Sequence, residues 1–141
     1  MSENSASASS LSDVRAKSCH VLYSDDVHEL RMLMQHTLSA AGLEITCVPD
    51  GADAWAEVQK NPGYFNVVIT DHHMPHMSGL ELVKRLRATG FGGRIVVVSS
   101  ELGEPTDLSY HELGVDALLK KPIKFSQLPE LLHELTNRGA A

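Results

Sequence analysis

The feature that most constrains the fold of this chain is a repeated alternation of short apolar runs and longer amphipathic segments, which begins at residue 18. The runs are of strand length, and several are rich in valine and isoleucine, as strands buried on both faces tend to be. They cover Cys19–Tyr23, Leu43–Val48, Asn66–Thr70, Arg94–Ser99 and Val115–Leu119. Such a succession of βα units predicts an α/β fold, an open sheet of parallel strands joined by right-handed crossovers with helices on both faces.

The amphipathic segments between these runs carry helix spacing and helix-capping residues. Apolar side chains recur at helix spacing up to Gly42, which suits the C-terminus of a first helix. Ser78, followed three residues later by Glu81, is a capping box and predicts the start of a third helix. We also expect a second helix from Asp50 to about Lys60, and we expect the third helix to end near Ala88. A fourth helix is expected over Thr106–Leu113 and a fifth from Ser126 onward.

Composition indicates one soluble globular domain. The chain has 141 residues, 43% of them hydrophobic and 21% charged, which is enough for one buried core. The net charge of −6 argues against a nucleic-acid-binding face, and no apolar stretch is long enough for a signal peptide or a membrane span. Cys19 and Cys47 are too few for a disulfide framework or a zinc site, so we expect buried free thiols in a reducing cytoplasm.

One domain is expected over residues 18–137. Residues 1–17 are rich in serine and alanine and offer too little apolar surface to offset the entropy lost on ordering, so we expect a disordered tail. A docking role for that tail stays open as an alternative. Residues 138–141 are expected to form a short C-terminal tail.

Chemically distinctive side chains follow several of the apolar runs. Because the carboxyl ends of parallel strands meet at one edge of a sheet, we expect these side chains to lie close together. They are Asp25 and Asp26 after the first run, Asp71 after the third, Ser99 and Ser100 at the end of the fourth, and Lys121 after the fifth.

This set predicts a metal-assisted phosphoryl site. Three neighbouring carboxylates repel one another unless a cation joins them, and Mg²⁺ suits an oxygen site that keeps several waters and shares a phosphate. Asp26 and Asp71 are expected to bind the metal directly, and Asp25 through waters. A carboxylate can also act as a nucleophile. We assign that role to Asp71, with Lys121 and Ser99 contacting phosphoryl oxygens.

Simpler roles compete with these. Acidic residues at strand ends often cap the following helix, and Asp26 with Glu29 fits that role. His72, His73 and His76 suggest a transition-metal site, but their close spacing on one irregular loop gives no obvious converging geometry. The joint placement of acids, hydroxyls and lysine favours the phosphoryl site.

These residues resemble the receiver domain family of response regulators, which has the CheY-like fold, over roughly residues 18–137. The resemblance rests on Val21–Asp26, Val67–Pro75 with Gly79 shortly after, Val96–Ser100 and Leu119–Pro122. It implies a doubly wound, flavodoxin-like (βα)5 fold, with a five-stranded parallel sheet in the order 2-1-3-4-5. It also implies a role in two-component signal transduction.

The resemblance also implies the role of each site residue. Asp71 is the implied phosphoacceptor. Its phosphoryl group would come from the phosphohistidine of a histidine kinase or from a small donor such as acetyl phosphate. Asp25, Asp26 and Asp71 form an acidic pocket for Mg²⁺ or Mn²⁺, and the backbone carbonyl of His73 also contacts the metal.

The resemblance further implies that Ser99 is the switch hydroxyl and that Lys121 contacts the phosphoryl group, with a cis bond to Pro122.

Two positions depart from the family pattern. The position three before the lysine, often tyrosine or phenylalanine in the family, is Leu118 here. In relatives that aromatic side chain changes rotamer as the switch hydroxyl moves toward the phosphoryl group. With Leu118 this response is either muted or achieved by packing alone. His73 lies where relatives control the lifetime of the aspartyl phosphate, and we expect it to fill the pocket mouth rather than orient water.

The function expected is a stand-alone signalling module whose output goes through a partner protein, because the chain ends soon after its fifth helix. The expected partners are a sensor histidine kinase or histidine phosphotransfer protein and a downstream protein target, without nucleic acid or membrane. The module is expected to be a monomer or a phosphorylation-dependent dimer, and to catalyse only its own phosphorylation and dephosphorylation.

Other readings remain open. The chain can be a phosphorelay intermediate, a phosphate sink, or a phosphorylation-independent interaction module, a reading to which Leu118 gives some support. An aspartyl phosphohydrolase is disfavoured, since the haloacid-dehalogenase pattern has a second aspartate where this chain has His73.

Overall fold

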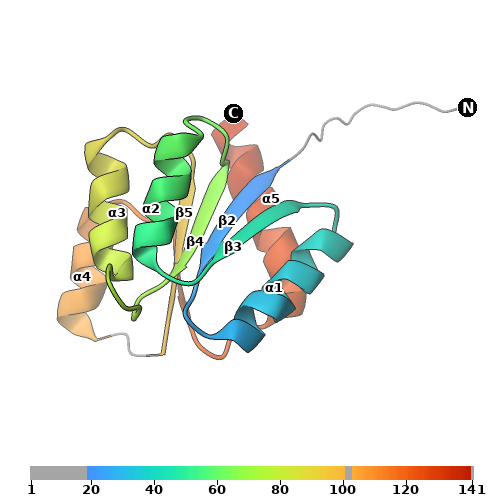
Figure 1. Cartoon of the computed structure of the whole chain (residues 1–141), viewed down its shortest axis with the longest axis horizontal. Coiled ribbons are helices and arrows are strands. Elements are labelled where there is room, and N and C mark those ends of the chain that lie inside the picture. Colours follow the sequence, from blue (N-terminus) through green and yellow to red (C-terminus); the bar gives the residue numbers. More distant parts are fainter. Residues whose placement is uncertain (1–18, 101–102, 141) are drawn as a thin grey trace, which may run out of the picture.

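One parallel sheet lies between two layers of helices in the computed structural model of the chain (Figure 1), which describes residues 19–100 and 103–140. The strands are β2 (His20–Ser24), β3 (Glu44–Val48), β4 (Val67–Asp71), β5 (Arg94–Ser99) and β6 (Ala117–Lys120). The helices are α1 (His28–Ala40), α2 (Gly51–Lys60), α3 (Gly79–Ala88), α4 (Glu104–Glu112), η1 (Phe125–Gln127, a 3₁₀ turn) and α5 (Leu128–Ala140).

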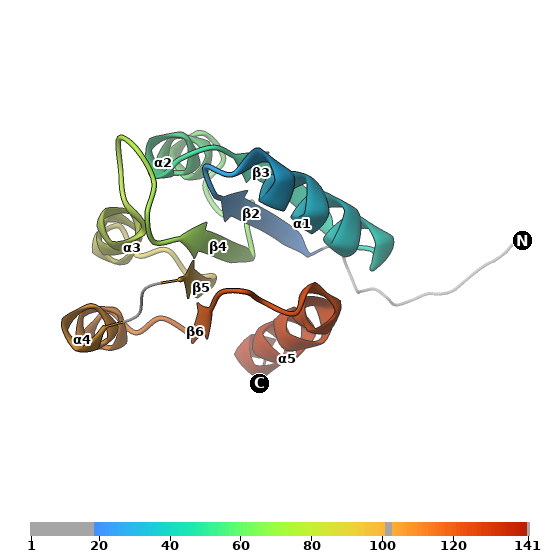
Figure 2. The ribbon, with the colours of Figure 1, turned by 90° about the horizontal axis from the view of Figure 1, so that it is seen from below.

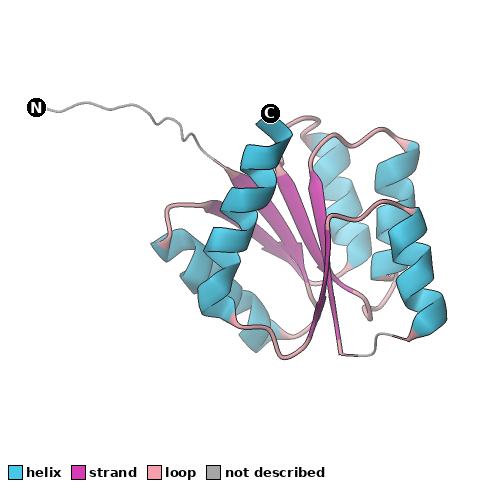
Figure 3. Cartoon of the chain, turned by 180° about the vertical axis from the view of Figure 1, so that it is seen from behind, coloured by secondary structure: helices cyan, strands magenta, loops and turns pink. Residues whose placement is uncertain are grey.

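The sheet has the topology that the resemblance implied. Its strands lie in the order β3-β2-β4-β5-β6, which is 2-1-3-4-5 in chain order, and all neighbouring pairs are parallel. Figure 2 shows α1 and α5 on one face of the sheet and α2, α3 and α4 on the other. Seen from behind, the C-terminal helix α5 lies in front of the sheet (Figure 3). The predicted doubly wound α/β fold is therefore confirmed.

The sheet separates two apolar cores because consecutive residues of a strand face opposite sides. Val21 and Tyr23 of β2 pack with Met34 of α1 in one core. Leu22, which lies between them, packs with Leu82 of α3 in the other. All five side chains are at most 1% exposed. Strands buried on both faces explain why the sequence shows continuous apolar runs rather than alternation.

The predicted helix starts at Asp50 and Ser78 are confirmed, but the capping box is only half formed, because the Glu81 carboxylate accepts hydrogen bonds from Arg85 and not from the Ser78 N–H. The carboxylate of Asp50 accepts a hydrogen bond from the Asp53 N–H at 2.9 Å at the start of α2. The hydroxyl of Ser78 accepts one from the Glu81 N–H at 3.2 Å at the start of α3. Gly42 follows α1 with a φ of 87°, a left-handed conformation that favours glycine. The Asp50 and Ser78 caps set the helix starts that follow the carboxyl edge of the sheet, whereas Gly42 lies in a loop that leads into the start of β3 at the opposite edge.

Three boundaries differ from the prediction. α4 begins at Glu104, two residues early, because Pro105 suits the first turn of a helix. The turn η1 precedes α5, so the helix begins at Leu128 and not at Ser126. No proline interrupts α5 near its end, and it continues to Ala140, so residues 138–140 are helical and not a separate tail. The tail predicted over residues 1–17 lies outside the described residues.

Gly79 brings the start of α3 against the end of β4. A Cβ atom added to Gly79 would lie 2.3 Å from the backbone oxygen of Asp71, far inside van der Waals contact. The Gly79 N–H also donates a hydrogen bond to the His72 carbonyl at 2.9 Å. The position of Asp71 therefore depends on the absence of a side chain at residue 79.

We predict that Gly79→Ala lowers the free energy of unfolding by about 2 kcal/mol, because the added methyl group must push the Asp71 backbone aside. Urea unfolding followed by circular dichroism measures this change. Gly92→Ala is the matched control, since a Cβ atom there meets nothing within 4 Å, and it should change stability by no more than about 0.5 kcal/mol. Equal stabilities for the two variants would mean that the loop relaxes around the methyl group.

Candidate functional site

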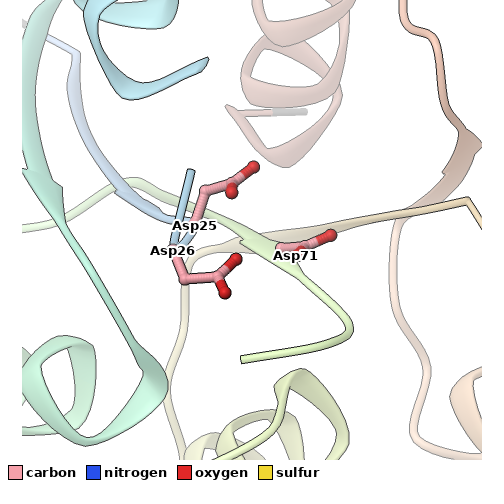
Figure 4. A group of neighbouring side chains, drawn as sticks. All are labelled: Asp25, Asp26 and Asp71. Carbon is pink, nitrogen blue, oxygen red and sulfur yellow. The ribbon is translucent and has the colours of Figure 1, made fainter. Parts of the chain in front are cut away.

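The residues predicted to form the site come together at the carboxyl edge of the sheet. Asp71 is the last residue of β4, and Asp25 and Asp26 follow β2. One carboxylate oxygen from each of the three lies within 4.8 Å of the others, and Figure 4 shows the three side chains beside one another. Ser99 ends β5 and is buried, and Lys121 follows β6. The strand-end prediction is therefore confirmed as a spatial arrangement.

Asp25 is fully buried, and its carboxylate is held by hydrogen bonds from two sides. The Tyr23 hydroxyl donates to Oδ2 at 2.6 Å, and the Val27 N–H donates to Oδ1 at 2.8 Å. Asp26 is exposed. The helix-cap alternative for Asp26 is wrong, because Val27 is the N-cap of α1 and no side chain caps it. The Asp25 carboxylate is therefore held inside the protein, whereas the neighbouring Asp26 is open to solvent.

Lys121 is the counter-charge of the buried carboxylates. Its Nζ lies 3.1 Å from Asp71 Oδ1 and 3.4 Å from Asp25 Oδ2. The Lys121 N–H donates to the Ser99 carbonyl at 2.9 Å, and the bond to Pro122 is cis, as the resemblance implied. Burial alone opposes the charged ammonium, yet the hydrogen bond to Asp71 and both carboxylate charges raise the pKa of Lys121. The lysine is therefore held in its charged form.

The surroundings of Asp71 disfavour the negative charge of its carboxylate. Burial, and then the charge of Asp25, raise the pKa of Asp71 above its ordinary value. The hydrogen bond and the charge of Lys121 lower it, but they do not reverse the shift. Both effects disfavour the ionised carboxylate, as burial beside a like charge does in general. The pocket therefore disfavours the charge on Asp71 unless a further cation shares the site.

The donor set fits a hard divalent cation. The three carboxylates face one ammonium group, which leaves two negative charges uncompensated within this cluster. Oxygen ligands in a carboxylate cluster are the ligands that Mg²⁺ binds. Within residues 19–100 and 103–140, this is the one group of three or more histidine, cysteine or acidic residues with ligand atoms close enough to hold a metal ion. His72, His73 and His76 form no such group, so the transition-metal alternative has no structural support.

The loop after Asp71 is fixed to the start of α2. His76 Nδ1 lies 2.8 Å from Asp50 Oδ2, and His76 itself has a φ of 67°, a left-handed conformation that is uncommon for a residue other than glycine. Burial alone would raise the pKa of Asp50, but hydrogen bonds from the Asp53 N–H and from His76 lower it. A Cβ atom on Gly51 would also lie 2.4 Å from the Met77 carbonyl oxygen. Close packing therefore constrains the loop that carries His73.

Sequence reasoning missed two tyrosines that contact this site. Tyr23 was counted only as part of an apolar run, although its hydroxyl binds Asp25. Tyr110 of α4 is fully buried, and its hydroxyl lies 2.5 Å from Nδ1 of His72, the residue after Asp71. The only available signal was a polar hydroxyl on an otherwise apolar helix or strand face, because such a group usually finds a hydrogen-bond partner when it is buried.

Comparison with known proteins places this geometry in one family. The family model described as the response regulator receiver domain matches residues 21–133. The chain belongs to this family. It is therefore a receiver domain of two-component signalling, and an acidic cluster at the carboxyl edge of its sheet can hold a metal ion.

Individual receiver proteins resemble the chain along most of its length. It is 32% identical over 123 residues to a chemotaxis protein CheY homolog of Campylobacter jejuni, which covers 85% of this chain and 94% of that protein. It is also 32% identical over 125 residues to the sensory/regulatory protein RpfC of Xanthomonas campestris, a match to 86% of this chain but only 17% of RpfC. This receiver domain thus spans a small part of one relative and nearly all of another.

Solved structures agree with the fold. The chemotaxis protein CheY4 of Vibrio cholerae has a TM-score of 0.74 at 32% identity, covering 83% of this chain and 98% of that one. A CheY-like receiver protein of Methanospirillum hungatei reaches a TM-score of 0.81 at 20% identity and supports the fold alone. In the part of the receiver domain that the structure describes, no helix is both long and apolar enough to cross a membrane.

We predict that Asp71→Asn raises the thermal midpoint in EDTA at neutral pH. The raised pKa of Asp71 means that the folded state binds its proton more tightly than the unfolded state does. Wild-type stability from this group is therefore fully present below the unfolded pKa and is lost as pH rises through the folded pKa. The gain of the variant should be largest above the folded pKa of Asp71 and should vanish below its unfolded pKa.

Differential scanning calorimetry across this pH range measures the effect. Asp53→Asn removes the same charge from an exposed position in the first turn of α2. This control should not raise the midpoint, because an acidic side chain there favours the helix dipole. An Asp71→Asn midpoint below that of the wild type at neutral pH would show that the Lys121 ion pair outweighs burial and repulsion.

Proposed function

We propose that this receiver domain accepts a phosphoryl group on Asp71 and passes the signal to a partner protein. The observation that carries the proposal is Lys121 Nζ lying 3.1 Å from Asp71 Oδ1, beside a carboxylate cluster whose ligand atoms lie within 4.8 Å of one another. A fixed ammonium group and a divalent cation next to one carboxylate supply the positive charges that phosphoryl transfer requires.

In the proposed step, a lone pair on an Asp71 carboxylate oxygen attacks phosphorus, and a P–O bond forms. The bond between phosphorus and the leaving group breaks, and its electron pair goes to the leaving group. That group is the imidazole nitrogen of a phosphohistidine, which takes up a proton, or the acetate of acetyl phosphate, which leaves as an anion. Since Asp71 must be ionised to attack, the cations around it also maintain its reactive form.

We propose Mg²⁺ or Mn²⁺ as the resident metal. When bound, it would supply positive charge against the carboxylates and the phosphoryl oxygens. Asp26 and Asp71 are proposed as direct ligands, with the backbone carbonyl of His73 as another. Asp25 acts through waters, because Oδ1 and Oδ2 already accept hydrogen bonds from within the protein.

The remaining site residues complete the proposed chemistry. Ser99 is buried at the end of β5, and its hydroxyl is proposed to donate to a phosphoryl oxygen. His73 is exposed on the loop after Asp71, which suits a side chain that covers the mouth of the site. The domain is proposed to catalyse only its own phosphorylation and dephosphorylation and to act on no separate substrate.

A histidine kinase or a histidine phosphotransfer protein is the proposed phosphodonor, and a protein target is the proposed receiver of the signal. Cys19 and Cys47 are free thiols, which fits a reducing cytoplasm. The sensory/regulatory protein RpfC contains a similar segment within a much longer chain, and a role as a phosphorelay intermediate is the alternative proposal for this domain.

Intact mass after incubation with acetyl phosphate and Mg²⁺ tests the phosphoacceptor. We predict that the wild type gains the mass of one phosphoryl group, that EDTA prevents the gain, and that Asp71→Asn shows none. Asp53→Asn, the exposed matched control, should gain the group as the wild type does. Phosphorylation of Asp71→Asn would move the phosphoacceptor elsewhere. A wild type that accepts nothing from acetyl phosphate or from histidine kinases would favour a phosphorylation-independent module.

We further predict that Lys121→Gln slows phosphorylation by acetyl phosphate at least about tenfold, because a charge-assisted contact to the reacting carboxylate and phosphoryl group is lost. The rate is measured by quenched-flow mass spectrometry. Lys120→Gln is the control, since Lys120 is the exposed preceding residue, at the end of β6, and makes no ion pair with Asp25 or Asp71. Equal rates for both variants would remove Lys121 from the transfer step.

A further inference from the structure

The structure joins α4 to the residue after Asp71 by a hydrogen bond between two side chains. The Tyr110 hydroxyl lies 2.5 Å from His72 Nδ1, and the two rings meet edge to face with centroids 5.6 Å apart. Tyr110 is fully buried, whereas His72 directly follows Asp71 on the chain. The contact therefore connects the residue beside the proposed phosphoryl site with the interior face of a helix in the outer layer.

We propose that the Tyr110–His72 hydrogen bond holds α4 in its resting arrangement, so that phosphorylation of Asp71 is transmitted to α4 through Tyr110. This inference rests on the proposed function of Asp71. Tyr110 acts through His72 and touches neither the metal ligands nor the phosphoryl group, so it is a positioning residue. A contact made in one arrangement and weakened in another biases the equilibrium between them.

The main chain of His72 is anchored on both sides. Its N–H donates to the Val98 carbonyl at 3.0 Å, and its carbonyl accepts from the Gly79 N–H at 2.9 Å. These bonds tie residue 72 to β5 and to the start of α3. With the main chain of residue 72 held in place, its imidazole is the part that can transmit a change at Asp71 to Tyr110 of α4.

Tyr110 also supplies the aromatic group that the family places elsewhere. The usual aromatic position is Leu118 on β6, and its apolar side chain packs against the same core cluster that contains Tyr110. Burial, with the charge of Asp71, raises the pKa of Tyr110 and keeps its hydroxyl protonated. The Tyr110 hydroxyl is thus an uncharged group in contact with His72, and it comes from α4 and not from the neighbouring strand.

A movement of α4 would change the outer surface of the domain. Leu108 precedes Tyr110 by two residues and therefore lies on the opposite side of the helix. It is 58% exposed, which makes it one of the large apolar side chains on the surface of the described residues. Displacement of Tyr110 inside the core would shift Leu108 outside, where a partner protein can sense it.

Amide NMR spectra of the full chain test the proposal, with Mg²⁺ and beryllofluoride as the phosphoryl analogue on Asp71. Tyr110→Phe deletes the hydroxyl and keeps the buried ring. In the variant without the analogue, we expect the α4 resonances to move from the wild-type positions toward those of the analogue-bound wild type. The further change on adding the analogue should be at least about twofold smaller than in the wild type.

Tyr64→Phe is the matched control, because Tyr64 is 45% exposed and stacks on His20 at the start of β2. It should show wild-type α4 shifts and a full response. Tyr110→Phe with a full response, or with α4 shifts unrelated to the line between the two wild-type states, would overturn the proposal.

His72→Leu deletes the other partner and completes a double-mutant cycle. If the hydroxyl acts through His72, the double variant should respond as the single variants do, and additive effects would overturn the proposal. Intact mass after acetyl phosphate treatment is measured on the same samples. Tyr110→Phe should still accept one phosphoryl group. A wild type that accepts none overturns the proposed function and this inference together, whereas normal phosphorylation with a full α4 response overturns the inference alone.

Discussion

The architecture of the site depends on the repulsion between two carboxylates that the fold buries side by side. Asp25 has no exposed surface and Asp71 has little, yet their charges are opposed within the cluster only by the ammonium group of Lys121. Close, buried like charges are unfavourable unless other groups compensate them. The tyrosine hydroxyl and the backbone N–H that bind Asp25 provide part of this compensation, and a divalent cation would provide the rest. The same imbalance weakens the metal-free fold and favours the binding of a cation beside Asp71.

Parallel topology makes this arrangement feasible because it brings separate segments of the chain to one edge. The backbone N–H of Lys121 reaches Ser99, and that of His72 reaches Val98. Sheet-like hydrogen bonds thus continue past the ends of the strands and hold the loops in register. Gly79 allows α3 to approach the end of β4 so closely that any side chain at that position would meet Asp71. The acidic pocket is therefore rigid at its base, where the strands end, and open on the side of Asp26.

The fold and the charged residues of the site could be predicted because each depends on a signal that is local in sequence. Apolar runs report burial on both faces, and an aspartate or lysine directly after such a run has only one edge of the sheet to occupy. Contacts between distant segments left no comparable signal. Met32 and Met34 of α1 are alike in sequence, yet Met32 is 59% exposed while Met34 is fully buried, because residues two apart on a helix face different sides. The His76–Asp50 and His72–Tyr110 pairs join residues far apart in sequence, and their partners are fixed only by how the loops close.

The effect of Leu118, a single departure from the family pattern, can be judged only from its surroundings in the structure. In sequence it is the loss of an aromatic residue near the phosphoryl lysine, and it gave some support to a module that works independently of phosphorylation. In the structure, the core cluster that Leu118 packs against already contains a buried tyrosine from α4, with its hydroxyl on the residue after Asp71. That cluster also holds Phe65, with Trp55 and Phe91 packed against it, so a leucine on the strand does not leave this core without aromatic side chains. The polar link to the residue after Asp71 comes from Tyr110 of α4 and not from the strand that carries Leu118.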